Sequence, residues 1–207
     1  MIRILMKTIT TIALAAGMTA CSPSGAQAQN VSQVKEAAEV NSNWTVDKSA
    51  SSISFSSEMN GEAFTGHFGN FTADIQFDPS HVSDARIHVS IDMTSADAND
   101  EERNDALPGK EWFSAKKFPS AVFNSNSVKA TLDDQFEAAG ALTIRDVTKP
   151  LILPFRLEIV DGIAHATAQT SIDRSDFGVG TGVWKSEDWV AHKVEINIKI
   201  KATKKTI

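Results

Sequence analysis

Apolar and polar residues alternate strictly along most of this chain, and this period of two restricts its fold more than any other feature. The segments 71–77, 86–93 and 194–202 each carry apolar residues at every second position. Because successive side chains of a strand point to opposite faces, each segment has one apolar and one polar face. Many such segments predict one antiparallel sheet, which must curl into a barrel or fold into a sandwich to cover its apolar face.

Turn residues separate the alternating segments and define the expected strands. Asp133-Asp134 and Asp161-Gly162 lie between adjacent segments and predict hairpins. Two stretches, 96–118 and 175–189, break the rhythm, and loops of that length in a compact domain are usually functional. The expected strands are 44–46, 52–57, 67–77, 85–93, 121–124, 128–132, 136–144, 151–159, 163–172 and 194–202.

Length and charge limit the class of protein. The 207 residues predict one domain plus an export segment, and a 42% hydrophobic content is enough for a real core. The net charge is -6, and loss of Arg3 and Lys7 on export would leave 18 basic against 26 acidic residues, about -8. A protein with this net negative charge is not expected to bind nucleic acid, because the phosphate backbone is also negative.

The first residues have the pattern of an export signal. Arg3 and Lys7 precede a short apolar stretch, 9–18, which is too short to span a bilayer as a helix. Ala26-Gln27-Ala28 resembles a cleavage site that would release a free periplasmic protein. Met18 to Cys21 resembles a bacterial lipoprotein box, in which Cys21 would be acylated and anchor the chain to the membrane. Both alternatives place the protein in the periplasm.

Catalytic and metal-binding motifs are missing from the sequence. The five histidines are scattered without metal-ligand spacing, and no nucleophile elbow or phosphate-binding loop occurs. The acidic run from Asp97 departs from a calcium loop at Glu102, where glycine is needed, and at Pro108, where a carboxylate is needed. We therefore expect no enzyme activity, no metal site and no cofactor.

Five segments carry more specific motifs. They are WTVDKSASSISFSS (44–57), GHFGNFTADIQFDP (66–79), EWFSAKKFPSAVFNS (111–125), GALTIRDVTKPLILPF (140–155) and IDRSDFGVG (172–180). In this order they resemble the YceI-like family of exported lipid-binding proteins. Asp146 stands where that family usually has glycine. The run 97–105 lacks the family's R-D-x-H-L stretch, with Arg103 and Asp105 as only loose counterparts.

The resemblance implies an all-β fold, a lipocalin-like antiparallel β-barrel of about eight strands with short helical turns. Such a barrel is wide enough for one small ligand. The implied function is a non-catalytic carrier for a long-chain amphiphile: a polyisoprenoid, an isoprenoid quinone or a fatty-acid derivative. The implied organisation is an export signal (1–28), a linker or short helix (29–43), the barrel (44–202) and a tail (203–207). Long loops would also allow a homodimer.

The candidate ligand-binding residues are apolar or aromatic, and they come from inward strand positions and from the two long loops. Plain core packing is the alternative for each of them, and a solid-core interaction module or an unrecognised enzyme are the alternatives for the whole. Beside Phe177, the polar residues Asp173, Arg174 and Asp176 could contact a head group. The candidates are Phe68, Phe71, Ile91, Trp112, Phe113, Phe118, Phe123, Leu142, Ile144, Phe177, Trp184 and Trp189.

Overall fold

The computed structural model describes residues 43–132 and 134–205. The expected export signal, the acylation candidate Cys21 and nearly all of the expected linker lie outside these residues.

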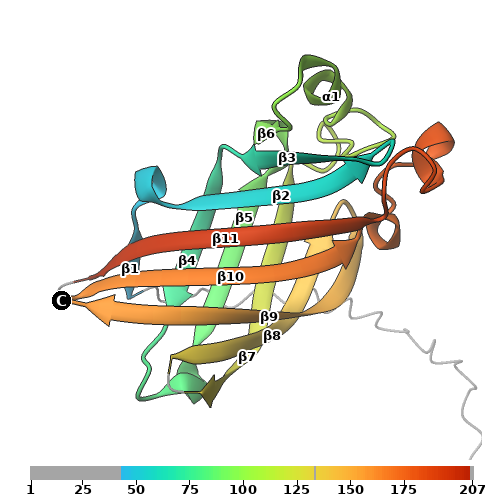
Figure 1. The fold of residues 1–207 in the computed structure, drawn as a ribbon. Coiled ribbons are helices and arrows are strands. Elements are labelled where there is room, and N and C mark those ends of the chain that lie inside the picture. The colour runs from blue at the N-terminus through green and yellow to red at the C-terminus, as the bar shows by residue number, and fades with distance from the viewer. Residues whose placement is uncertain (1–42, 133, 206–207) are drawn as a thin grey trace, which may run out of the picture. The chain divides into compact units, whose positions relative to one another are not determined.

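Eleven strands, one α-helix and five 3-10 turns make up the described residues (Figure 1). The helical elements are η1 (Lys48–Ala50), η2 (Val82–Asp84), η3 (Met93–Ser95), α1 (Glu101–Ala106), η4 (Arg174–Phe177) and η5 (Gly182–Lys185). The strands are β1 (Trp44–Val46), β2 (Ser52–Met59), β3 (Glu62–Phe68), β4 (Phe71–Gln76), β5 (Arg86–Asp92), β6 (Ala96–Asp97), β7 (Ser120–Leu132), β8 (Gln135–Ile144), β9 (Val147–Val160), β10 (Ile163–Asp173) and β11 (Lys193–Lys204).

The strands form one antiparallel sheet in the order β4-β5-β7-β8-β9-β10-β11-β2-β3-β6, with β1 beside β11. The sheet curls on itself because β3 continues into β4 and β5 continues into β6 through a shared bend. At that bend the Gly69 N–H donates to the Ser95 carbonyl (2.9 Å) and the Asp92 N–H to the Asn70 carbonyl (3.0 Å). The predicted lipocalin-like β-barrel architecture is confirmed.

Inward-facing positions follow the predicted period of two. All of the inward residues expected on β8 and β9, such as Phe136, Leu142 and Phe155, belong to or pack against the main core cluster. The Asp161-Gly162 hairpin is also confirmed, since both residues take the positive φ angles (50° and 76°) of a tight β-turn. At the β8–β9 turn the positive φ falls on Arg145 (59°) rather than on Asp146.

Three of the expected strands are divided differently in the structure, and several others differ only in their end residues. The expected strand 67–77 is wrong as one element, because the bend at Gly69 divides it into β3 and β4. The expected strands 121–124 and 128–132 are one strand, β7, whose register against β8 shifts between Ser125 and Ser127. This bulge changes the inward phase from odd to even positions, which made one strand look like two.

The wall of the sheet parts between β9 and β10. Their pairing ends at Phe155 opposite Ala168, although β9 extends back to Val147 beside β8 and β10 extends to Asp173 beside β11. β9 before Phe155 and β10 after Ala168 therefore each have an edge that no described strand covers.

Two prolines explain where the strands part. The Leu157 N–H donates to the Asp134 carbonyl before β8, so odd-numbered residues of β9 point their backbone groups toward β8. Even-numbered residues, including Pro150 and Pro154, therefore face β10. Because proline has no N–H to donate, the ladder toward β10 cannot continue past Phe155.

Candidate ligand-binding site

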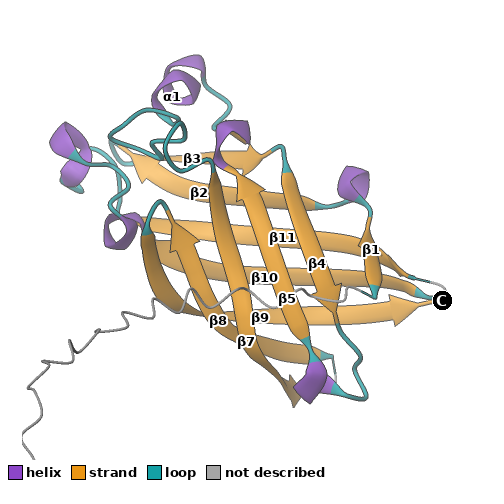
Figure 2. Ribbon diagram, turned by 180° about the vertical axis from the view of Figure 1, so that it is seen from behind, coloured by secondary structure: helices purple, strands orange, loops and turns teal. Residues whose placement is uncertain are grey.

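An apolar cavity is lined by strand residues of the barrel together with residues of α1, η4 and η5. Figure 2 shows α1 at one end of the barrel. This upper cavity has a volume of about 250 Å³. Its wall is almost entirely apolar and combines strand residues such as Phe55 and Leu142 with loop residues such as Leu107 and Trp112. Its polar lining residues are Ser57, Asp100, Glu102, Arg103 and Arg174.

A second, inner cavity of about 110 Å³ continues along the barrel, and Ile53 lines both spaces. Its wall carries Phe77, Leu157 and the alanines Ala164, Ala166 and Ala168 of β10. Ala166 lies directly opposite Leu157 in the β9–β10 pairing, and the small side chains of the alanines leave room beside the larger residues. Apart from Thr167, every residue lining the inner cavity is apolar.

A third hollow, open to solvent, lies where β9 and β10 part. It has a volume of about 480 Å³ and shares Phe155, Thr167, Ala168 and Ile198 with the inner cavity. Outward polar residues such as Gln135 and Lys199 line its outer part. The upper cavity, the inner cavity and this hollow thus form a series of neighbouring spaces from the loop end to the side of the barrel.

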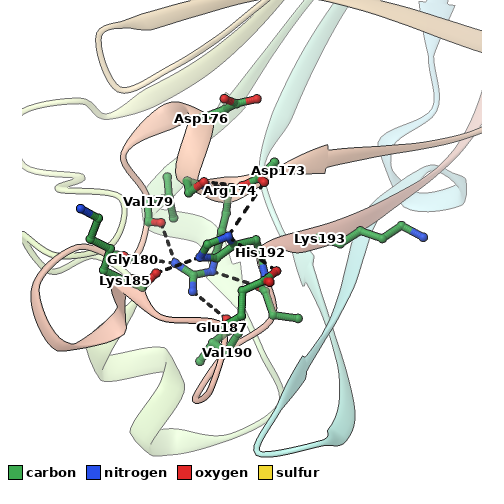
Figure 3. Close-up of polar contacts among 12 residues, drawn as sticks. Asp173, Arg174, Asp176, Val179, Gly180, Lys185, Glu187, Val190, His192 and Lys193 are labelled. Atoms are coloured by element: carbon green, nitrogen blue, oxygen red, sulfur yellow. Dashed lines mark hydrogen bonds and ion pairs between the residues drawn. The ribbon is translucent and has the colours of Figure 1, made fainter.

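The buried side chain of Arg174 holds the loop between β10 and β11 over the upper cavity (Figure 3). Burial lowers the pKa of its guanidinium below the ordinary value, while the charges of Asp173 and Glu187 act in the opposite direction. An arginine remains charged under these conditions. Its nitrogens donate to the carbonyls of Val179 (2.9 Å), Gly180 (3.1 Å), Trp184 (2.8 Å), Val190 (2.7 Å) and Ala191 (3.0 Å).

The glycine-rich loop is closely packed against this guanidinium. A Cβ on Gly180 would lie 1.9 Å from an Arg174 nitrogen, and the φ of Gly180 is 77°, so only glycine fits there. The Gly180 and Thr181 N–H groups both donate to the Glu111 carbonyl (2.8 Å each), which joins this loop to the loop after α1. Arg145 adds a link between the loops through the carbonyls of Trp112 and Gly178.

The head-group contact expected beside Phe177 stays a prediction, and its three polar residues have other partners in this structure. The Arg174 nitrogens donate to loop carbonyls. The Asp173 carboxylate caps η4 by accepting from the Ser175 N–H (2.8 Å) and hydroxyl (2.6 Å). Asp176 is exposed and pairs with Lys149 (3.2 Å). These polar groups organise the loop.

Several carboxylates with a lowered pKa also accept hydrogen bonds from nearby residues and so organise local turns. Hydrogen bonds from Ser49, Thr94, Asn104 and Ser175 lower the pKa of the carboxylates Asp47, Asp92, Asp97 and Asp173 respectively. Within the described residues, no three His, Cys, Asp or Glu side chains gather as a metal site would require, and no helix is long and apolar enough to cross a membrane.

Comparison with known proteins identifies the family. The model of the YceI-like domain matches residues 44–202. The chain belongs to the YceI-like family. Among curated relatives, a UPF0312 protein of Vibrio campbellii is 33% identical over 103 residues (49% of this chain, 54% of the relative), and Protein YceI of Salmonella arizonae is 37% identical over 92 residues (44% and 48%). The chain thus spans about half the length of the curated relatives that it matches.

Solved structures agree with this YceI-like assignment. Burkholderia cenocepacia BcnA has a TM-score of 0.75 and 31% identity, covering 77% of this chain and all of BcnA. A polyisoprenoid binding domain from Saccharophagus degradans has a TM-score of 0.65, covering 79% of this chain and 99% of that domain. Its identity of 12% shows a shared fold alone.

The YceI-like barrel brings seven of the candidate ligand-binding residues together on the wall of the upper cavity: Phe68, Ile91, Trp112, Phe113, Leu142, Ile144 and Trp184. Their role toward a ligand stays a prediction, but their convergence from β3, β5, β8 and both long loops is a property of the structure.

The other five candidates lie away from the upper cavity. Phe71, Phe123 and Phe177 are buried among core residues, and Phe118 lies beside Lys117 and Arg145. Trp189 is 54% exposed on the β10–β11 loop. An aromatic residue in a long loop therefore did not by itself indicate a place at the cavity.

Several residues that line the upper cavity are not among the candidates predicted from the sequence. Phe55 occupies an inward position of an expected strand and could have been chosen on the same grounds as Leu142. Phe64 was missed because β3 has Ala63 facing outward and Gly66 facing inward, which blurs the alternation. Gly66 is required there, since a Cβ would lie 2.3 Å from the Phe55 ring.

Proposed function

We propose that this YceI-like protein is a non-catalytic carrier that holds a long-chain amphiphile inside its barrel. The observation that carries the proposal is the pair of adjoining, almost wholly apolar cavities that share Ile53. A solid-core interaction module would have filled this space with side chains, because protein interiors are close-packed.

Burial of the ligand's tail would supply most of the affinity. Each buried methylene contributes roughly 0.8 kcal/mol, and few polar groups are needed to fix orientation. The two cavities are small, so a long tail would continue through the inner cavity into the hollow where β9 and β10 part. The polyisoprenoid binding domain of Saccharophagus degradans, which shares this fold, supports a prenyl chain as the tail.

We place this carrier in the periplasm, either free or anchored through an acylated Cys21. The basic residues and short apolar stretch of the first 18 residues support export. Cys21 is the single cysteine of the chain, and its position directly after the apolar stretch supports acylation.

A series of ligands that differ only in tail length tests the proposal. Calorimetric titration with straight-chain alcohols of increasing length should show Kd falling about fourfold for each added methylene until the cavities are filled. The series should then reach a plateau. Affinities that do not depend on tail length would contradict binding inside the barrel.

A further inference from the structure

A slit divides the wall of the barrel where β9 and β10 part. The last paired residues are Phe155 and Ala168, so the lips of the slit are residues 150–154 of β9 and 169–173 of β10. Beyond its other end, Lys149 of β9 pairs with Asp176 of η4 (3.2 Å). The slit is therefore bounded by a strand pair at one end and by one ion pair at the other.

Both lips contribute residues to the cavity walls. Leu153 of β9 lines the inner cavity, and Ile172 of β10 lines the upper cavity. At the end of the slit, Phe155 and Ala168 line both the inner cavity and the hollow that is open to solvent. A chain that passes between the lips therefore reaches the apolar space inside the barrel.

Parting the lips of the slit breaks few bonds. Pro150 and Pro154 face β10 and have no N–H, so no continuous backbone ladder joins the lips. The ion pair of Lys149 and Asp176 joins two exposed side chains, and such a surface pair contributes little to stability.

The loop end of the barrel is held more firmly. Arg174 donates to five loop carbonyls, and the N–H groups of Gly180 and Thr181 both donate to the Glu111 carbonyl. Arg145 donates to two further carbonyls, one in each long loop. Opening this end would break several of these bonds together, and a buried polar group left unpaired is costly. The slit is therefore the easier route into the barrel.

We propose that the slit between β9 and β10 is the entrance through which the apolar chain of the amphiphile passes into the barrel, while the loop end stays closed. This entrance rests on the proposed carrier function, and it adds the route by which the carrier is loaded and unloaded.

Cross-linking each end in turn tests the route, with the fluorescent straight-chain fatty acid cis-parinaric acid as the probe. In a Cys21→Ser background, Ile152→Cys and Ser171→Cys place one thiol on each exposed lip, and a short bis-maleimide joins them. Stopped-flow fluorescence should show association and dissociation both slowed about tenfold, because the barrier to passage rises. The Kd at equilibrium should stay the same, because neither residue lines a cavity.

Glu111→Cys with Thr181→Cys is the matched control, because its cross-link joins the two loops where the Thr181 N–H contacts the Glu111 carbonyl. It should leave both rates unchanged. Slower exchange with the loops joined but not with the lips joined would overturn the slit and assign the entrance to the loop end. Equal slowing by both cross-links would also overturn it.

A second variant closes the slit without a cross-linker. Pro150→Val with Pro154→Val restores two N–H donors that face β10, so the ladder can continue past Phe155. Exchange of cis-parinaric acid should again slow at an unchanged Kd. Unchanged rates in this variant and with the lips joined would overturn the entrance while leaving the carrier function intact. If the unmodified protein binds no cis-parinaric acid at equilibrium, the carrier function fails and the entrance fails with it.

Discussion

The upper and inner cavities differ in how the chain builds them. The upper cavity is lined partly by residues of the two long loops and has charged groups in its wall. The inner cavity is built from strands and leaves its space by placing alanines on β10. The contrast shows that the strand pattern builds an almost wholly apolar wall, whereas charged side chains enter a cavity wall from the loops and short helical elements.

Removing Arg174 should disturb the loop end most strongly. Arg174→Met leaves five loop carbonyls without their donor, and each polar group left buried and unpaired costs about 1–3 kcal/mol. Urea unfolding should show this loss in the free energy of unfolding, and hydrogen exchange should accelerate in residues 179–191. The matched variant Arg86→Met, on the exposed start of β5, should cost less than 1 kcal/mol. A similar small cost for Arg174→Met would contradict the role given to this side chain.

Gly140 tests the close packing of β8 against β7. A Cβ at this position would lie 2.2 Å from the Asn124 carbonyl oxygen and 2.9 Å from the Phe123 ring. Gly140→Ala should therefore destabilise the barrel by about 1–3 kcal/mol, as overpacking does. Gly69→Ala provides the comparison, since its nearest neighbour would be 3.6 Å away. Thermal unfolding that shifts equally in both variants would refute the close approach at the β7 bulge.

Filling the inner cavity should weaken tail binding without touching the loops. Ala166 lines this cavity, and Ala166→Phe should reduce the affinity for a long-chain alcohol about tenfold, equivalent to losing two buried methylenes. His165→Phe places the same ring on the outer face of β10 and should leave affinity unchanged. Calorimetric titration decides between these outcomes, and unchanged binding in Ala166→Phe would remove the inner cavity from the binding path.

Acid should slightly lower the free energy of unfolding, through one carboxylate at each end of the barrel. Hydrogen bonds lower the pKa of Asp173 at the loop end and of Asp47 at the opposite end. A carboxylate with a lowered pKa stabilises the fold above its unfolded pKa, and this contribution disappears as pH falls through the folded value. The free energy of unfolding should thus stay level from neutral pH to about 5 and decline below about 4. Asp173→Asn should flatten the decline, and an identical profile would contradict this assignment.

The strand-built half of the molecule was largely predictable from the sequence. Alternation on β8 and β9 gave the inward positions of Leu142 and Phe155 because the pleat of a strand leaves no other choice. The separation of β9 from β10 was harder to predict from the sequence. It depends on which neighbour Pro154 faces, and that parity is known only once the strands are paired.

The loop-built half was predictable only in outline. Trp112 and Trp184 reach the upper cavity and Trp189 does not, yet all three are tryptophans in long loops. The β10–β11 loop is organised by Arg174, which donates to the carbonyls of Val179, Trp184 and Val190, and such many-partner contacts leave no periodic pattern in a sequence.

Native mass spectrometry of the protein purified without detergent, followed by organic extraction, tests the carrier function most directly. The proposed carrier function predicts a bound mass of several hundred daltons that is released as an amphiphile with a long apolar chain. An unliganded mass that stays unshifted after incubation with isoprenoids and fatty acids would contradict it and favour an interaction module.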